Sequence, residues 1–483
     1  MSAENNEKEK NKIVSGLLWK LLELGGTQGI QFVVSVILAR ILTPDEFGTI
    51  GLITIFITIA NTFVQSGFAT SLIQKKDVYD DDYSSVLWVS LAFALVMYVI
   101  LFFTAPLIAG YYEVPVLSSL IRVTGIILFP GALVSVQTSY VARNMQFRKL
   151  FTGSLIAVII SGAIAVFMAM RGAGVWSMSM QQIIYYFAMM IVMLFLISWK
   201  PKFVLALNRV KEFFSFGWKI LIAGLIDTIW TNVYGLVIGK KFSTAELGGY
   251  NRGDQFPKLI ATNLGTAVQA VMLPVYSKSQ DDKENLRDLL RSTVKFSSFF
   301  LLPMMVGLIA VARPLVSVLL TDKWLFCVPY LRILAVSYAL YPIHTANLQA
   351  INAQGRSDLF LKLEIIKKVS GIIFLVLGLQ FGIIPMLILK TVNEFVCAII
   401  NTHPNRKLLD YGFLKQMIDI LPSIICSVLM GVCASAVTLS GLTGVLLLVL
   451  QIAVGAASYL VFSLIINRDV VLKFKESIER NFR

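Results

Sequence analysis

The chain reads VILARILTPDEFG at residues 36–48 and LVIGKKFSTAELG at residues 236–248. In one register, the two stretches share a small residue, a cation, a hydroxyl, a glutamate, a large apolar residue and a glycine. Trp218 and Lys219 similarly repeat the Trp-Lys pair that opens the first apolar run. Because the matching positions include the polar ones, chance likeness between apolar segments explains them poorly, and we predict an internal duplication.

Long apolar runs surround both stretches and fill the rest of the chain. Of its 483 residues, 57% are hydrophobic and only 14% are charged, whereas globular chains carry about a quarter charged residues. The runs lie at residues 17–41, 48–68, 84–109, 118–141, 151–170, 175–198, 215–239, 255–276, 294–312, 328–350, 359–380, 383–401, 418–439 and 442–466. Since a crossing needs about 20 apolar residues, we predict an all-α integral membrane protein with about fourteen transmembrane helices.

The basic residues decide the orientation. A net charge of +14 suggests nucleic acid as a partner, but lysine and arginine are concentrated in alternate short segments between the apolar runs. The largest groups lie at residues 200–211, 278–295 and 468–483. Because cytoplasmic loops carry an excess of lysine and arginine, we place these segments and both termini inside (N-in/C-in). We expect no nucleic-acid partner, and a location in the bacterial plasma (inner) membrane.

Six crossings separate the two copies, so the copies have the same orientation. Such parallel repeats are related by an axis along the membrane normal, and substrate is expected where they meet. The predicted organisation is a cytoplasmic tail at 1–14, an N-lobe of helices 1–6 at 15–200, a cytoplasmic linker at 201–211, a C-lobe of helices 7–12 at 212–403, helices 13–14 at 404–466, and a cytoplasmic tail at 467–483.

Several segments resemble one known group of proteins. They are Leu38–Gly48, Gly249–Arg252 followed by Leu273–Lys278, Ala353–Asp358, and Arg143–Phe147. In these segments the chain is similar to bacterial polysaccharide flippases (the polysaccharide transporter family), above all to the colanic-acid and teichuronic-acid exporter branch. These belong to the multidrug/oligosaccharidyl-lipid/polysaccharide exporter superfamily. The likeness covers nearly the whole chain, although no single segment is decisive.

The resemblance implies a two-lobed helical transporter that works by alternating access. Its implied cargo is an oligosaccharide on undecaprenyl diphosphate, turned from the inner to the outer leaflet. In related lipid II flippases, two extra C-terminal helices form a groove for the lipid tail, and helices 13 and 14 are expected to do the same here. The implied partners are this lipid-linked oligosaccharide, membrane lipids and the polysaccharide polymerase machinery.

A diphosphate head needs help to cross hydrocarbon, because a bare ion faces an idealised Born cost on the order of 20 kcal/mol. Cations at or near the crossings outnumber acids in this chain, which predicts a positively lined cavity for an anionic cargo. The candidates for substrate binding are Arg40, Arg122, Lys219, Lys240, Arg252, Lys258, Arg332 and Lys367. Most of them lie near helix ends, so anchoring at the lipid headgroups is an open alternative.

Acidic residues within the crossings are candidates for coupling transport to a proton or sodium gradient. Asp227 lies near the middle of its helix, and Glu23 begins a polar stripe on the first helix. Glu394 follows Lys390 by four positions, so mutual neutralisation is the alternative there. Pro130 and Pro342 occupy corresponding places in the two copies and are candidate hinges, because proline removes a helical hydrogen bond.

Other classes of protein remain as rivals. A multidrug exporter of the same superfamily would share the fold, with an acidic rather than a cationic interior. A membrane glycosyltransferase is disfavoured, because the predicted outer loops are short. Neither a cofactor nor a metal is expected: the four cysteines show no paired spacing, and only two histidines are present.

Overall fold

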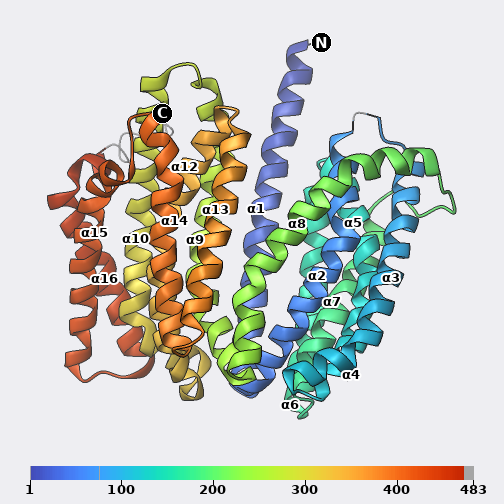
Figure 1. Ribbon diagram of the computed structural model, residues 1–483, viewed down its shortest axis with the longest axis horizontal. Coiled ribbons are helices and arrows are strands. Elements are labelled where there is room, and N and C mark those ends of the chain that lie inside the picture. Colours follow the sequence, from blue (N-terminus) through green and yellow to red (C-terminus); the bar gives the residue numbers. More distant parts are fainter. Residues whose placement is uncertain (1, 76, 473–483) are drawn as a thin grey trace. The chain divides into compact units, whose positions relative to one another are not determined.

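The computed structural model describes residues 2–75 and 77–472, and within them it is helical without a β-strand (Figure 1). The first half contains α1 (Ser2–Ile41), α2 (Pro44–Gln74), α3 (Asp80–Tyr112), α4 (Val116–Thr124), η1 (Gly125–Ile127), α5 (Leu128–Arg143), α6 (Phe147–Met170), α7 (Val175–Leu196) and α8 (Leu207–Lys241). The second contains α9 (Thr244–Lys278), α10 (Lys283–Leu320), η2 (Asp322–Cys327), α11 (Val328–Tyr338), α12 (Tyr341–Ala353), α13 (Ser357–Gly378), α14 (Ile383–Leu408), α15 (Phe413–Ala436), η3 (Val437–Ser440) and α16 (Gly444–Ile466).

Every apolar run predicted to cross the membrane is helical. Among the described residues, 12 helical segments are long and apolar enough to span a bilayer. The runs that fall outside this set are α1 and α13, and α13 is interrupted by charged residues such as Glu364 and Lys368. The all-α membrane fold is therefore confirmed, whereas the count of fourteen crossings and the side on which the termini lie stay predictions.

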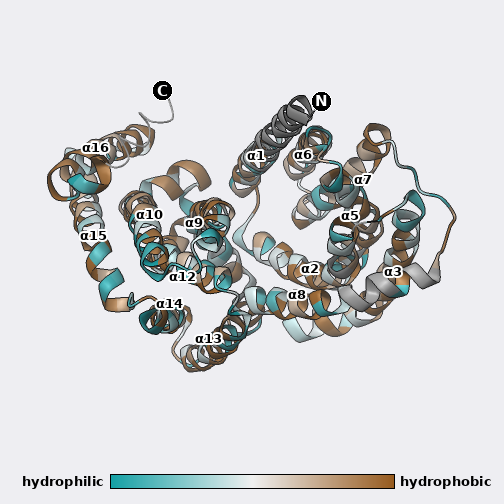
Figure 2. Ribbon diagram, turned by 90° about the horizontal axis from the view of Figure 1, so that it is seen from above, coloured by the Kyte–Doolittle hydropathy of each residue, from teal (hydrophilic) through white to brown (hydrophobic). Residues whose placement is uncertain are grey.

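Large apolar side chains remain exposed along the helices, as a lipid-facing surface requires. On α16, Val445, Leu460 and Ile465 are each more than half exposed. Figure 2 shows that α15 and α16 are coloured hydrophobic over most of their length. In water such a surface would be a site of association, but in a bilayer it contacts acyl chains.

The chain forms two compact units, Met1–Gly248 (unit 1) and Gly249–Arg483 (unit 2), which divide within α9. In unit 1, α6 packs against α1 and α7, and α2 packs against α5 and α8. In unit 2, α10 packs against α15, and α11, α12 and α13 pack against α14. The sequence assigned α8 to the second lobe, and here it packs against α2 and α3; the predicted lobe boundaries stay predictions.

The repeated stretch forms the same helix start twice. At the α1–α2 turn the backbone N–H of Glu46 donates to Thr43 Oγ1 at 3.3 Å, and the Thr43 N–H donates to Glu46 Oε2 at 2.7 Å. At the α8–α9 turn the Glu246 N–H donates to Ser243 Oγ at 3.1 Å. At the start of α2 the shared hydroxyl and glutamate thus form a capping box, and at the start of α9 the hydroxyl accepts the corresponding backbone bond. Such bonds satisfy amide groups that a helix start leaves unpaired.

The shared glycines allow the two helix starts to touch. A Cβ atom on Gly48 would collide with the backbone carbonyl oxygen of Thr244, and one on Gly248 would collide with the carbonyl oxygen of Pro44. The Thr244 hydroxyl also donates to Asp45 Oδ1 at 2.8 Å. The starts of α2 and α9 therefore pack backbone to backbone, which only glycine permits at these positions.

The fourth crossing of each copy is broken. In the first copy, the turn η1 separates α4 from α5, and Pro130 is the third residue of α5. In the second, α11 ends at Tyr338 and α12 begins at Tyr341, one residue before Pro342. Both candidate hinge prolines thus follow a break in the helix. Movement about these breaks stays a prediction.

Candidate substrate cavity

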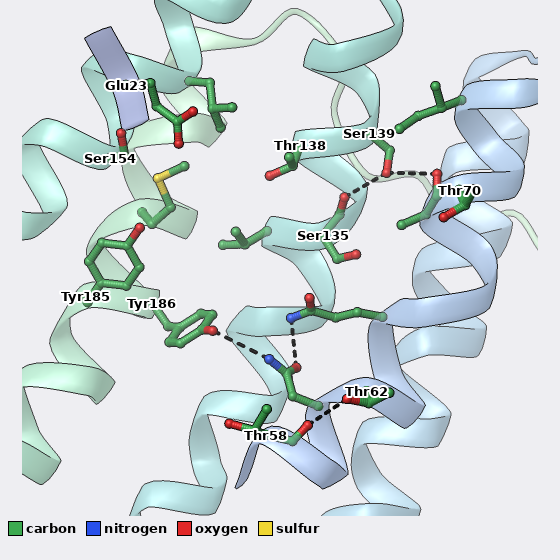
Figure 3. Close-up of a pocket in the computed structure, with 17 residues that line it drawn as sticks. Glu23, Thr58, Thr62, Thr70, Ser135, Thr138, Ser139, Ser154, Tyr185 and Tyr186 are labelled. Carbon is green, nitrogen blue, oxygen red and sulfur yellow. Dashed lines mark hydrogen bonds between the residues drawn. The ribbon is translucent and has the colours of Figure 1, made fainter. Parts of the chain in front are cut away.

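Five helices of unit 1 line an open cavity of about 580 Å³ with many polar residues (Figure 3). The volume lies in the range of about 300–1,000 Å³ that is usual for ligand pockets. Its walls are α1, α2, α5, α6 and α7. The polar residues that line it are Glu23, Thr58, Asn61, Thr62, Gln65, Thr70, Ser135, Thr138, Ser139, Ser154, Tyr185 and Tyr186.

The polar face of α2 forms one wall. Thr58, Asn61, Thr62 and Gln65 are three or four residues apart, so they share one side of the helix. Gln65 Nε2 donates to Asn61 Oδ1 at 2.8 Å, and Asn61 Nδ2 reaches the Tyr186 hydroxyl at 3.5 Å. Figure 3 shows both bonds as dashed lines, of which the one to Tyr186 joins α2 to α7.

Several wall hydroxyls donate their hydrogen to backbone carbonyls. Thr58 donates to the Thr54 carbonyl at 2.7 Å, and Ser154 donates to the Phe151 carbonyl at 3.1 Å. Ser139 lies within hydrogen-bond distance of the Ser135 and Ala69 carbonyls, at 3.0 and 3.3 Å. Because the hydrogen is occupied, each of these hydroxyls offers mainly acceptor lone pairs to a ligand.

The unit 1 cavity has little charge, and the cationic cavity predicted where the two copies meet stays a prediction. Among the described residues that line it, Glu23 is the one acidic residue, and none is a lysine or an arginine. Figure 3 shows Glu23 beside Ser154 at one end of the cavity. Glu23, which begins the polar stripe of the first helix, thus lies on the cavity wall, and its role in ion coupling stays a prediction.

The other unit 1 candidates lie outside this cavity. Arg122 Nε donates to the Phe102 carbonyl at 3.1 Å, with its guanidinium 4.4 Å from the centre of the Phe102 ring. Lys240 Nζ pairs with Glu113 Oε1 at 2.9 Å. Three further candidates have exposed side chains: Arg40, Lys219 and Asp227.

The candidates in unit 2 are mostly paired with neighbouring side chains. Arg252 is buried and donates to Gln255 Oε1 at 2.5 Å. Lys258 lies 3.8 Å from Asp254, and Lys367 lies 2.5 Å from Glu364. Arg332 is exposed, and its Nε donates to the Ile309 carbonyl at 3.2 Å.

A second polar cluster joins α9, α11, α12 and α14 in unit 2. His344 Nε2 lies 3.5 Å from Glu394 Oε2, and Asn401 Nδ2 lies 2.9 Å from His344 Nδ1. Nearby, Lys390 donates to the Tyr250 hydroxyl at 3.0 Å, and the Tyr338 hydroxyl donates to Asp254 at 3.1 Å. Glu394 therefore faces His344 in addition to the lysine that precedes it on α14.

Sequence reasoning missed most of the cavity wall because it weighed charged residues above uncharged ones. A signal was present. Thr58, Asn61, Thr62 and Gln65 repeat at helical spacing inside an apolar run, and Ser135, Thr138 and Ser139 do so in α5. Amides are unusual on the lipid-facing side of a membrane helix, since their hydrogen bonds are lost there.

Comparison with known proteins agrees with this fold. Residues 37–329 match the family model of the polysaccharide biosynthesis proteins. The chain is 27% identical to the teichuronic acid biosynthesis protein TuaB of Bacillus subtilis, over 93% of this chain and 94% of TuaB. It is 28% identical to the succinoglycan biosynthesis transport protein ExoT of Rhizobium meliloti, over 66% of this chain and 65% of ExoT.

Among solved structures, the lipid II flippase MurJ in an inward closed conformation matches with a TM-score of 0.77 at 18% identity, over 94% of this chain and all of MurJ. The chain thus shares the fold of this flippase, and its 12 described helical segments that are long and apolar enough to span a bilayer make it a multi-pass membrane protein. Because the family model matches more than half of its length, the chain belongs to the family of polysaccharide biosynthesis proteins.

Proposed function

We propose that this chain carries an oligosaccharide linked to undecaprenyl diphosphate from the inner to the outer leaflet of the bacterial plasma membrane. The observation that carries the proposal is a cavity lined by hydroxyl and amide groups, among membrane helices of a polysaccharide biosynthesis protein. The names of ExoT and MurJ, which include succinoglycan transport and lipid II flipping, support the same step.

The physical task explains why a protein is needed. Each sugar hydroxyl loses its hydrogen bonds to water in hydrocarbon, and the diphosphate faces a far larger desolvation cost. A polar cavity inside helices replaces those bonds while the lipid tail stays in the bilayer. Alternating access exposes such a cavity to one side of the membrane at a time, so the cargo moves without an open pore.

We propose that exposed cations near the crossings contact the diphosphate. Arg40, Lys219 and Lys258 have exposed side chains on membrane helices, where a charged group is stable only near water, headgroups or a partner, such as Asp254 at 3.8 Å from Lys258. Arg122, Lys240, Arg252, Arg332 and Lys367 hold partners in this structure and would have to exchange them to bind cargo.

We propose Glu394 as the coupling acid. Its carboxylate faces His344 and lies on the same helix as Lys390, so one added proton or cation changes the balance of a small charged cluster. Glu23 and Asp227 are the other candidates. A proton or sodium gradient acting on such an element would drive cargo outward.

A multidrug exporter is the second candidate. Glu23, together with the lack of lysine and arginine in the described lining, suits an organic cation. Family membership supports the glycan cargo instead.

We further propose that the polysaccharide polymerase machinery receives the cargo at the outer face.

Deletion of the gene separates these candidates. We expect lipid-linked oligosaccharide to accumulate on the cytoplasmic leaflet and surface polysaccharide to disappear, with both restored by the wild-type gene. The variant Asn61→Leu with Tyr186→Phe should restore export poorly at equal protein abundance. Thr104→Val, which alters a hydroxyl of α3 outside the cavity, should restore it fully. Intact surface polysaccharide together with new sensitivity to organic cations would identify a drug exporter.

A further inference from the structure

We infer that His344 and Glu394 take up the coupling proton as one pair, and that the amide of Asn401 turns when they do so. The inference rests on the proposed function and deepens it in two ways. It names the proton as the coupling ion, and it assigns roles to two residues besides the coupling acid. All three side chains belong to unit 2, His344 on α12 and the other two on α14.

The contacts of the imidazole determine which of its nitrogens carries a hydrogen. Asn401 Nδ2 lies 2.9 Å from His344 Nδ1. An amide nitrogen only donates, so Nδ1 accepts, and the hydrogen of the neutral ring is on Nε2. Nε2 faces Glu394 Oε2 at 3.5 Å. Before it takes up a proton, the pair therefore holds one hydrogen and carries one negative charge.

The amide of Asn401 can exchange its two ends. Asn401 is fully buried, and its Oδ1 accepts no hydrogen bond from the described residues, so a half turn of the amide breaks only the bond to Nδ1. When one proton is added, Nδ1 carries a hydrogen and donates it to Oδ1 of the turned amide, and the other hydrogen bridges Nε2 and Glu394 Oε2. The pair is then neutral. Release of the proton to water restores the first state.

The internal duplication identifies the corresponding positions in unit 1. The hydroxyls of Thr124 on α4 and Ser179 on α7 lie 2.5 Å apart. Those of Ser337 on α11 and Thr391 on α14 lie 2.6 Å apart. Because the fourth and sixth crossings of both copies are joined by the same contact, α7 and α14 correspond to each other, as do α4 and α11.

The first copy has uncharged residues where the second has the pair. Three residues after the α7 hydroxyl lies Gln182, whereas Glu394 lies three residues after the α14 hydroxyl. Gln182 Nε2 donates to Thr54 Oγ1 at 3.1 Å. Similarly, Gly131 follows the α4 hydroxyl by seven residues, as His344 follows the α11 hydroxyl. The fold is thus built once without ionisable groups at these positions, so their presence inside a membrane protein points to function.

Other titratable groups surround the pair. Lys367 acts electrostatically on both members, and Lys390 acts on Glu394. Both lysines oppose a metal cation at the carboxylate. The remaining titratable groups on the packed helices either act on Glu394 or are paired with neighbours: Tyr338 of α11, Cys397 of α14, Glu364 of α13, Arg291 and Lys295 of α10, and Asp419 of α15.

The local backbone also favours a proton over sodium. Sodium sites in transporters use carbonyl oxygens of unwound helices, whereas α14 is continuous from Ile383 to Leu408. The imidazole offers no lone pair to a metal ion, because Nδ1 accepts from Asn401 and Nε2 carries the hydrogen. A proton needs only the two facing side chains.

NMR of the imidazole nitrogens tests the inference on the purified full-length protein in lipid nanodiscs. The chain contains two histidines, so His403→Gln leaves His344 as the one isotope-labelled ring. At about pH 8 we expect a hydrogen on Nε2 alone. Toward about pH 5, the lower end of the range in which histidine usually titrates, a second hydrogen should appear on Nδ1.

Three variants test the parts assigned to the neighbours. In Glu394→Gln the midpoint of this titration should fall by at least about one pH unit, because the facing carboxylate no longer stabilises the second hydrogen. Asn401→Leu should leave hydrogen distributed over both nitrogens at about pH 8. Asp358→Asn is the control, since Asp358 pairs with Arg356 at the start of α13, and it should titrate like the unsubstituted protein.

Transport in vesicles gives an independent readout. A proton gradient should accelerate flipping by the unsubstituted protein and by Asp358→Asn, but it should not accelerate flipping by His344→Gln. A sodium gradient should have no effect on any of them. Three results would each overturn the inference: no hydrogen on Nδ1 down to about pH 5, an unchanged midpoint in Glu394→Gln, or flipping driven by sodium.

These outcomes differ from failure of the proposed function. A deletion strain that exports its polysaccharide normally would remove the flippase proposal, while a pair that titrates as expected would still establish a proton site in unit 2. Accumulated lipid-linked oligosaccharide in the deletion strain, with a His344 that takes up no proton, would keep the flippase and place its coupling at other residues.

Discussion

Arg122 donates a hydrogen bond to a backbone carbonyl of the neighbouring helix α3 that has no helical partner. Pro106 lies inside α3 and has no N–H, so the carbonyl four residues earlier, that of Phe102, loses its helical partner. The Arg122 Nε supplies a replacement at 3.1 Å. This residue was a candidate for cargo binding because an arginine in a membrane segment is costly. The hydrogen bond to the Phe102 carbonyl explains equally well why an arginine is present here, because it replaces the helical bond that Pro106 removes.

We therefore expect Arg122→Met to destabilise the protein by about 1–2 kcal/mol, since it leaves a carbonyl without a donor. Pro106→Ala restores a backbone N–H at the right position, so the same substitution should cost less in that background. The coupling is measured from thermal unfolding of the purified single and double variants. Equal losses of stability in both backgrounds would contradict this structural role, and Arg122 would again be a candidate for cargo binding.

Glu394 gives the second prediction at the scale of a residue. In Glu394→Gln the group can no longer gain or lose a proton or hold a cation by charge. Transport in vesicles should become insensitive to ionophores that collapse the proton or sodium gradient, while slow downhill flipping persists. Glu364→Gln is the matched control, since Glu364 also lies beside a lysine, at 2.5 Å from Lys367. If both variants keep the wild-type response, coupling belongs to Glu23 or Asp227.

Among the elements, the starts of α2 and α9 pack backbone to backbone. The repeated stretch of thirteen residues combines three structural features. They are cations in the last turn of α1 and α8, a capping hydroxyl, and a glycine where the starts of α2 and α9 touch. A last-turn cation is favourable beside the negative end of the helix dipole. The two copies of the duplicated sequence match at these positions because each residue has a structural role there.

Gly48→Ala should destabilise the protein by about 1–3 kcal/mol, because the added methyl group meets backbone and cannot be relieved by a side-chain rotation. Gly110→Ala is the control. Its Cβ meets nothing within 4 Å, so the helix propensity of alanine should raise stability by up to about 1 kcal/mol. Unfolding of the two purified variants in one detergent gives the comparison. Shifts of the same sign would contradict the close crossing.

For the whole molecule, the sequence predicted the helices and their class because apolar length alone specifies a membrane helix. The cavity was harder to predict. A hydroxyl such as that of Thr58 can bond to its own helix anywhere in a membrane, so its presence does not reveal which way it faces. The partner of Arg122 was also hidden, because it is a backbone carbonyl on another helix. Charge patterns thus predicted an orientation in the membrane, whereas the polar surface of the cavity became visible only in the three-dimensional structure.

If the proposed alternating access moves α8 and the start of α9 relative to α1 and α2, the contact between the α1–α2 and α8–α9 turns opens and closes during the cycle. Asp45 and Thr244 meet there through a hydrogen bond of 2.8 Å, so Asp45→Cys with Thr244→Cys should form a disulfide under mild oxidation. Oxidation should stop flipping of lipid-linked oligosaccharide in vesicles, and reduction should restore it, since the bond holds both turns together. Each single cysteine variant should flip cargo with or without oxidant. Undiminished transport by the fully cross-linked protein would show that this contact stays closed throughout the cycle, and access would then have to alternate at other helices.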